Sequence, residues 1–132
     1  MESKINEIVE SNNANNVITL GYKNQLELPE IYASFDVFVL PSGVGETWGL
    51  VVNEAMLFGL PVIVSDLVGC SDDLVKDNGY TFKFNSVPEL IKAMNNIEED
   101  LKSNKKLGKN SLQLIDKYSY DTIIKELSNA HD

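Results

Sequence analysis

An almost uncharged stretch in the middle of the chain constrains the fold most. Residues 37–65 carry two charged side chains, those of Glu46 and Glu54. The stretch begins and ends in short apolar runs, residues 36–40 (DVFVL) and residues 61–65 (PVIVS). Apolar runs of this length, bounded by Pro, Ser and Gly, are typical of buried parallel strands. The apolar segment between them is long enough for the crossover helix that parallel neighbours need, so we predict an α/β fold.

The flanking segments alternate between helical and strand-like patterns, which predicts a Rossmann-like parallel sheet of about four strands flanked by helices. The predicted strands are residues 17–20, 36–40, 61–65 and 80–83. The predicted helices include residues 2–12, 26–34, 48–58, 71–76, 101–118 and 119–130. Thr47 is the predicted N-cap of the helix at 48–58, and Gly59 its end.

Composition excludes several classes of function. With 132 residues, the chain has the size of one domain, and we predict that residues 1–132 form one. Its 20 acidic residues outnumber 11 basic ones, all of them lysine, and give a net charge of -9. A nucleic-acid-binding protein needs a positive surface, so this balance argues against nucleic acid as a partner. Without arginine, bidentate recognition of phosphate by a guanidinium group is also excluded.

Cys70 and His131 are the single cysteine and the single histidine. One cysteine makes neither an internal disulfide nor a multi-cysteine zinc site, and we expect a reducing, cytoplasmic location. The penultimate position of His131 argues against a Ser-His-Asp or Cys-His nucleophile. The longest apolar stretch, residues 55–65, is shorter than the roughly 18 residues of a membrane span, so we expect no span. The N-terminus has no signal-peptide pattern.

Glu46 and Glu54 are the candidate functional side chains. An unpaired carboxylate among apolar strands and helices is costly, so each should face a polar partner, a cleft or a ligand. Glu46 follows the carboxyl end of a predicted strand, where open α/β sheets bind ligands. The free N–H groups of residues 47–50 at the start of the next helix predict an anion site. Together these features suit a sugar phosphate or a nucleotide sugar.

The whole run from residue 41 to residue 75 resembles the donor-binding signature of retaining glycosyltransferase family 4, which has the GT-B fold. Its hallmark is a pair of glutamates separated by seven residues, met here by Glu46 and Glu54. The EAM-x-x-G-x-PVI run from Glu54, Gly21 after the first predicted strand, and the Gly69 turn also match. The similarity extends from about residue 17 to the C-terminus, so the chain is similar to the latter, C-terminal portion of a GT-B donor domain.

The resemblance implies a role for each matched residue. Glu46, as the catalytic residue, would hold the transferred sugar together with Thr47 and Trp48, and the amides of Gly49 and Leu50 would face the diphosphate. Glu54 would bind the nucleotide ribose. Near the base the resemblance places Gly21, Tyr22 and Lys23. It further implies transfer with retention and no metal or other cofactor, in bacterial polysaccharide or glycoconjugate synthesis.

Two family elements have no match in the sequence. These are an arginine–lysine pair that clamps the diphosphate and an N-terminal acceptor domain. We therefore expect a missing domain or a partner chain to supply them, peripheral membrane contact to run through that domain, and the isolated chain to be inactive. A non-catalytic interaction or nucleotide-binding module remains the alternative. A phosphoacceptor receiver domain is discarded, because the strand at 36–40 ends in Pro and Ser instead of Asp.

Individual residues also have structural interpretations. Glu46 could be a turn carboxylate that favours a helix N-terminus, and Glu54 a helix glutamate facing solvent or a lysine. The side chain of Trp48 is expected to pack in the core more than to contact ligand. Cys70 is expected to be a small, partly buried residue, and Asp73 to begin a short helix.

Overall fold

The computed structural model describes residues 2–129 and divides the chain into two compact units, Met1–Ile31 and Tyr32–Asp132. In the first unit, α1 (Glu2–Ser11) is followed by an extended segment and a turn, and the next helix, α2 (Leu28–Ala33), crosses the boundary into the second unit. The two predicted helices of this region are thus present. His131 and the predicted end of the last helix, at residue 130, lie outside the described residues.

The first predicted strand, residues 17–20, is wrong, and the sheet has three strands instead of four. Val17 closes a turn after α1 by donating its N–H to the Ala14 carbonyl at 3.0 Å. Within the described chain no strand pairs with Ile18 or its neighbours. An apolar run becomes a strand only where a second backbone accepts and donates its hydrogen bonds, and such pairing is not encoded in the run itself.

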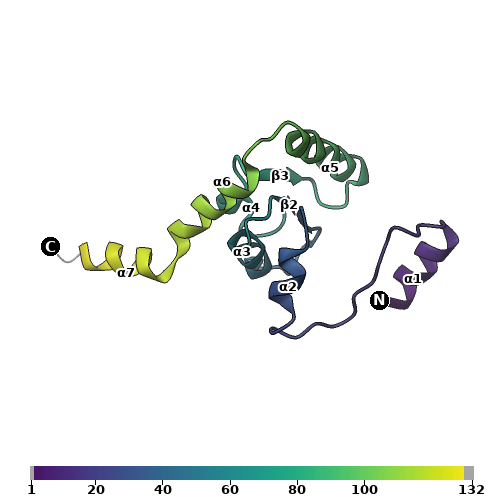
Figure 1. Ribbon diagram of the computed structural model, residues 1–132, viewed down its shortest axis with the longest axis horizontal. Coiled ribbons are helices and arrows are strands. Elements are labelled where there is room, and N and C mark those ends of the chain that lie inside the picture. The colour runs from purple at the N-terminus through teal and green to yellow at the C-terminus, as the bar shows by residue number, and fades with distance from the viewer. Residues whose placement is uncertain (1, 130–132) are drawn as a thin grey trace. The chain divides into compact units, whose positions relative to one another are not determined.

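The second unit contains a parallel sheet in the order β1-β2-β3, of which Figure 1 labels β2 and β3. Its strands are β1 (Phe38–Leu40), β2 (Val62–Ser65) and β3 (Gly79–Phe82). β1 is joined to β2 by α3 (Leu50–Leu57), and β2 to β3 by α4 (Ser71–Leu74). The predicted α/β fold with a parallel sheet is confirmed.

The alternating faces of the strands build two separate cores. On one face, Val62 and Val64 of β2 pack with Val52 and Met56 of α3. On the other face, Ile63 packs with the apolar side of the next helix, α5 (Val87–Lys102). Successive side chains of a strand point to opposite faces, so β2, buried throughout, separates two helical layers.

The C-terminal third contains α5, α6 (Leu107–Ile115), the short 3-10 helix η1 (Asp116–Tyr118) and α7 (Tyr120–Asn129). The helix predicted at 101–118 is divided, because α5 continues to Lys102 and a turn separates it from α6. Asn104 takes a left-handed conformation in that turn, with φ 58°. α6 packs against α3, on the same side of the sheet.

Candidate functional site

The loop from β1 to α3 leaves the carboxyl edge of the sheet and enters its helix through Gly49. This glycine has φ 90° and stands at the N-cap position of α3. A Cβ atom there would lie 2.7 Å from Val68 Cγ1, closer than atoms approach in real contacts. The predicted N-cap at Thr47 is therefore wrong: a left-handed glycine turns the chain, and the helix starts at Leu50, two residues later than expected.

The entry into α3 presents a row of unpaired backbone donors. Within the described chain, the N–H groups of residues 47–51 donate no hydrogen bond. The first bonded donor is Val52, whose N–H reaches the Gly49 carbonyl at 2.8 Å. Unpaired N–H groups at a helix start carry partial positive charge and attract anions. The predicted set of donors is present, although those of Thr47 and Trp48 belong to the loop.

A second loop fixes the position of these donors. The N–H of Cys70 donates to the Trp48 carbonyl at 3.0 Å. A Cβ atom on Gly69 would lie 1.9 Å from the Thr47 carbonyl oxygen, so the two backbones pass too closely for any side chain at that position. The loop after β2 thus holds residues 47 and 48 against the carboxyl edge of the sheet.

Trp48 is oriented by its own contacts. Its indole Nε1–H donates to Asn53 Oδ1 at 2.9 Å, and its ring lies 6.4 Å from that of Tyr118, tilted by 51°. The half-buried side chain also packs on the core between α3 and the sheet. The expectation that this side chain packs in the core is confirmed.

Glu46 stands in the same loop, half-buried, with a backbone N–H that donates to the Gly43 carbonyl at 3.3 Å. Among residues 2–129, no hydrogen bond or ion pair reaches its carboxylate. The loop is seated by Gly43, where a Cβ atom would lie 2.3 Å from Phe84 Cζ. A held loop that carries an uncommitted carboxylate can accept hydrogen bonds from hydroxyl groups of a ligand.

Glu54 lies in the second turn of α3 and has a partner that the sequence did not reveal. The Tyr32 hydroxyl donates to Glu54 Oε2 at 3.0 Å. Burial, reinforced by this carboxylate, raises the pKa of Tyr32 to about 12. The phenol therefore keeps its proton throughout the neutral range. In its structural interpretation from the sequence, Glu54 was expected to face solvent or a lysine. The structure shows a tyrosine hydroxyl as its partner instead.

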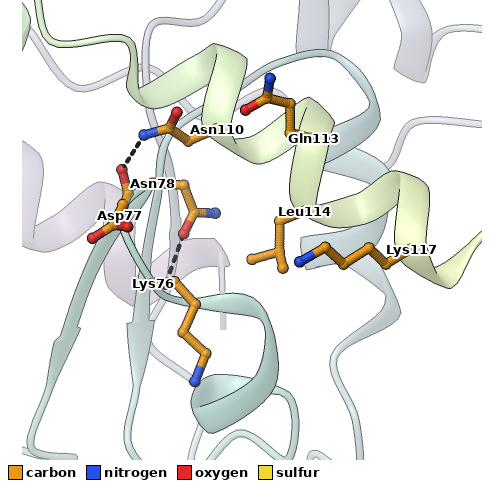
Figure 2. A pocket seen from close by; sticks show the side chains of 7 residues that line it. All are labelled: Lys76, Asp77, Asn78, Asn110, Gln113, Leu114 and Lys117. Carbon is orange, nitrogen blue, oxygen red and sulfur yellow. Dashed lines mark hydrogen bonds between the residues drawn. The ribbon is translucent and has the colours of Figure 1, made fainter.

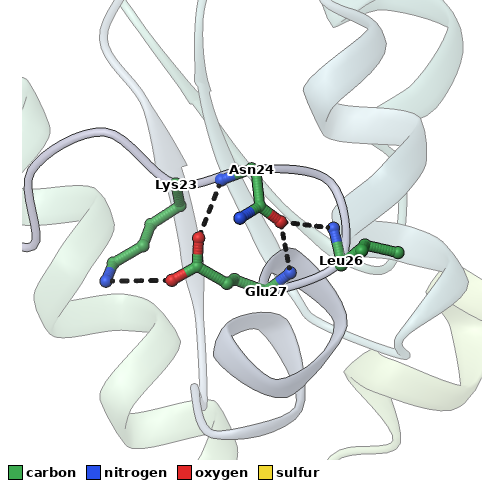
Figure 3. A network of polar contacts seen from close by, with 4 residues as sticks. All are labelled: Lys23, Asn24, Leu26 and Glu27. Carbon is green, nitrogen blue, oxygen red and sulfur yellow. Dashed lines mark hydrogen bonds and ion pairs between the residues drawn. The ribbon is translucent and has the colours of Figure 1, made fainter.

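The residues predicted near the base, Gly21, Tyr22 and Lys23, belong to the first unit. Gly21 has φ 65°, and the side chain of Tyr22 is almost fully exposed. Lys23 Nζ lies 3.4 Å from Glu27 Oε1, an ion pair between residues four apart (Figure 3). Both residues lie in the turn that leads into α2.

That turn is a capping box built by Asn24 and Glu27 (Figure 3). Asn24 Oδ1 accepts the N–H of Leu26 at 2.9 Å and that of Glu27 at 3.2 Å, and Glu27 Oε2 accepts the Asn24 N–H at 3.1 Å. The Asn24 N–H holds the pKa of the Glu27 carboxyl below its ordinary value, with a smaller contribution from Lys23. The Asn-x-x-Glu spacing is a recognisable signal that the sequence analysis missed.

Comparison with known proteins gives the family. Residues 2–114 match the family described as Glycosyl transferases group 1. The chain belongs to this family. It is 34% identical over 107 residues to the sulfoquinovosyl transferase SQD2 of Arabidopsis thaliana, a match that covers 78% of this chain and 21% of SQD2. It is 32% identical over 117 residues to the uncharacterized glycosyltransferase MJ1607 of Methanocaldococcus jannaschii, covering 87% and 30% of the two chains.

Solved structures agree with this assignment. Sucrose-phosphate synthase from Thermosynechococcus elongatus matches with a TM-score of 0.79 and 25% identity, over 98% of this chain and 33% of that one. Anabaena HepE in complex with UDP matches with a TM-score of 0.78 and 23% identity, over 98% and 35%. Such neighbours are GT-B glycosyltransferases, so the predicted fold class is confirmed. The group 1 glycosyl transferase chain spans about a fifth to a third of the length of these proteins.

Two cavities of this glycosyl transferase chain lie away from the β1–α3 loop. One, of about 540 Å³, lies between the turn before β3 and α6; Figure 2 shows Lys76 and Lys117 among its lining residues. Its wall is braced by the buried Asn78, which donates to the Leu74 carbonyl and Ser111 Oγ and accepts the Lys76 N–H. The other, of about 740 Å³, lies between β1 and α5. Neither is lined by Glu46, Glu54 or the residues between them.

Cys70 is fully buried, and burial raises the pKa of its thiol to about 11. At neutral pH it is a neutral thiol, and it is buried completely, whereas partial burial was expected from the sequence. Asp73 lies in α4, as expected, with its side chain exposed. Among residues 2–129, no three His, Cys, Asp or Glu side chains gather to hold a metal ion. Over the same residues, no helix is long and apolar enough to cross a membrane.

Proposed function

We propose that residues 1–132 are part of the donor domain of a retaining glycosyltransferase of family 4, and bind a nucleoside diphosphate sugar. The observation that carries the proposal is the entry into α3, where unpaired N–H groups of residues 47–51 lie between two half-buried glutamates. Amide donors suit a diphosphate and carboxylates suit sugar hydroxyls. Membership of the group 1 glycosyl transferases supports it. HepE, a structural neighbour, is described in complex with UDP and with UDP-glucose.

Each residue has a distinct task in the proposed reaction. Glu46 orients the transferred sugar, with Thr47 and Trp48 beside it. The N–H groups of Gly49 and Leu50 stabilise the negative charge that develops on the leaving diphosphate, which is an electrostatic form of catalysis.

Glu54 fixes the ribose, and Gly21, Tyr22 and Lys23 lie near the base. We further propose that the reaction needs no metal or other cofactor, takes place in the cytoplasm of a bacterium, and transfers a hexose to a glycan or lipid-linked acceptor in polysaccharide or glycoconjugate synthesis. The acceptor site, the cationic clamp and any peripheral membrane contact would come from a further domain or a partner chain. On this proposal, the isolated chain binds donor and does not turn it over.

Calorimetric titration of the chain with UDP and GDP tests the proposal. We expect binding in the millimolar range or tighter, lost in Glu54→Ala and retained in Glu99→Ala, an exposed glutamate of α5 that serves as the matched control. Equal loss in both variants would point to a general charge effect and would argue against the site. Absence of heat with either nucleotide would favour the alternative, a non-catalytic module of the same fold.

A further inference from the structure

We propose that Tyr32 is a positioning residue of the donor site: its hydroxyl holds Glu54 Oε2, so that Oε1 is presented to the ribose hydroxyls. The inference rests on the proposed function, because it assigns a task to Tyr32 only if Glu54 binds ribose. The Tyr32 hydroxyl lies 3.0 Å from Oε2, a good hydrogen-bond distance to a carboxylate.

Packing against two aromatic rings holds the phenol ring in this position. Tyr32 is 7% exposed, although it lies in a short helix. Its ring stacks on Phe58 at 5.4 Å between centroids, and lies 6.1 Å from Phe38 at an angle of 58°. These partners come from β1 and from the residue after α3, so the hydroxyl is fixed relative to the helix that carries Glu54.

The kind of partner matters as much as its position. Residues 37–65 contain no lysine, and within the described chain no ion pair involves Glu54. A neutral O–H donor engages one carboxylate oxygen and leaves the negative charge in place. Because the pKa of Tyr32 is raised to about 12, this donor does not ionise in the neutral range. The Glu54 carboxylate therefore has a set orientation and can still accept hydrogen bonds from a ligand.

A second tyrosine–carboxylate pair, Tyr80 and Asp100, differs in that both carboxylate oxygens have a partner. Tyr80 Oη donates to Asp100 Oδ2 at 2.6 Å, while Lys105 Nζ bonds to Asp100 Oδ1 at 2.5 Å. Both oxygens of Asp100 are engaged, and the group ties α5 to β3 and to the turn before α6. Glu54 has the same phenol donor on one oxygen, and no residue among 2–129 engages the other. This difference separates a structural carboxylate from one prepared for a ligand.

The test compares matched tyrosine variants by calorimetry, using UDP or GDP, whichever the chain binds more tightly. Tyr32→Phe should weaken binding about tenfold. Tyr80→Phe, which removes a phenol–carboxylate bond far along the sequence from the site, should change it less than about twofold. With the 2′,3′-dideoxy form of the same nucleotide, which lacks the ribose hydroxyls, Tyr32→Phe should bind as the unaltered chain does.

The outcomes separate the two proposals. If the unaltered chain binds neither nucleotide, the proposed function fails and this inference fails with it. If the unaltered chain binds the ribonucleotide and Tyr32→Phe binds it equally well, the positioning role alone is refuted. The same holds if Tyr32→Phe loses as much affinity for the dideoxy nucleotide as for the ribonucleotide. If Tyr32→Phe does not fold, Phe58→Leu is measured in its place, because it removes the ring that stacks on Tyr32. Phe58→Leu should weaken binding of the ribonucleotide and leave binding of the dideoxy nucleotide unchanged. Equal effects on the ribonucleotide and the dideoxy nucleotide would overturn the inference.

Discussion

Gly49→Ala should destabilise the chain strongly, because the substitution creates two separate costs. The position has φ 90°, which costs a residue with a Cβ atom about 1–2 kcal/mol. The new methyl group would also lie 2.7 Å from Val68 Cγ1 and 3.3 Å from Leu40 Cδ2, and overpacking of this kind costs about 1–3 kcal/mol. The total expected loss is about 2–5 kcal/mol, a large part of the roughly 5–15 kcal/mol that stabilises a typical domain.

Gly45→Ala is the matched control, because only the first cost applies to it. Gly45 has φ 118°, and no heavy atom lies within 4 Å of the position that a Cβ atom would take there. Urea unfolding followed by circular dichroism measures both variants. We expect Gly49→Ala to lose about 1–3 kcal/mol more than Gly45→Ala, with an unchanged m-value. Equal losses in the two variants would refute the conclusion that the helix entry is packed against the loop after β2.

Three further measurements follow. Cys70 is buried with a thiol pKa of about 11, so iodoacetamide at pH 7 should label it slowly in the folded chain and rapidly in urea; fast labelling of the folded chain would show that the thiol is accessible. Hydrogen bonds from Lys105 and Tyr80 lower the pKa of Asp100, so its contribution to stability is present above its unfolded value of 3.8 and is lost as the pH falls through the lower folded value. Asp100→Asn should therefore flatten the acid limb of a plot of urea midpoint against pH, and an unchanged limb would contradict this. Finally, nucleotide affinity should not fall as salt rises from about 0.01 to 0.15 M, because salt screens the repulsion between an anionic nucleotide and a chain of net charge -9 as well as the attraction of the backbone dipoles at the proposed site; a steep fall would indicate binding by lysines instead.

The β1–α3–β2 unit could be predicted because the patterns that indicate its strands and helix are local. Two apolar runs of strand length flank an apolar helix, and Gly59 lies after the helix as expected, with φ 71°. The segment at 17–20 has a similar apolar pattern and forms no strand. Its state depends on whether another strand pairs with it, and no property of the segment itself carries that information.

The entry of α3 shows a second limit of the sequence. Thr47 has a hydroxyl that could accept a capping hydrogen bond and Gly49 has no side chain, yet Gly49 occupies the N-cap position. The choice is made by tertiary contacts: Gly69 and Cys70 hold residues 47 and 48 in the loop, so the helix begins only beyond them. The intrinsic preference for Thr over Gly at an N-cap is worth only about a few tenths of a kcal/mol, and packing of this extent overrides it.

The sequence pattern identifies the two glutamates, whereas long-range contacts determine how they differ in the fold. The absence of other charges in residues 37–65 is enough to single out Glu46 and Glu54, because burying an unpaired carboxylate is costly. Their difference in the fold depends on Tyr32, 22 positions before Glu54, which engages one glutamate and not the other. Glu46, on a loop, has its position set by backbone contacts at Gly43 and Trp48, whereas Glu54, on a helix, has its orientation set by a side-chain donor. A flexible carboxylate on a rigid helix needs such a donor if it is to meet a ligand in one orientation, so on our proposal the phenol belongs to the site as much as the glutamate does.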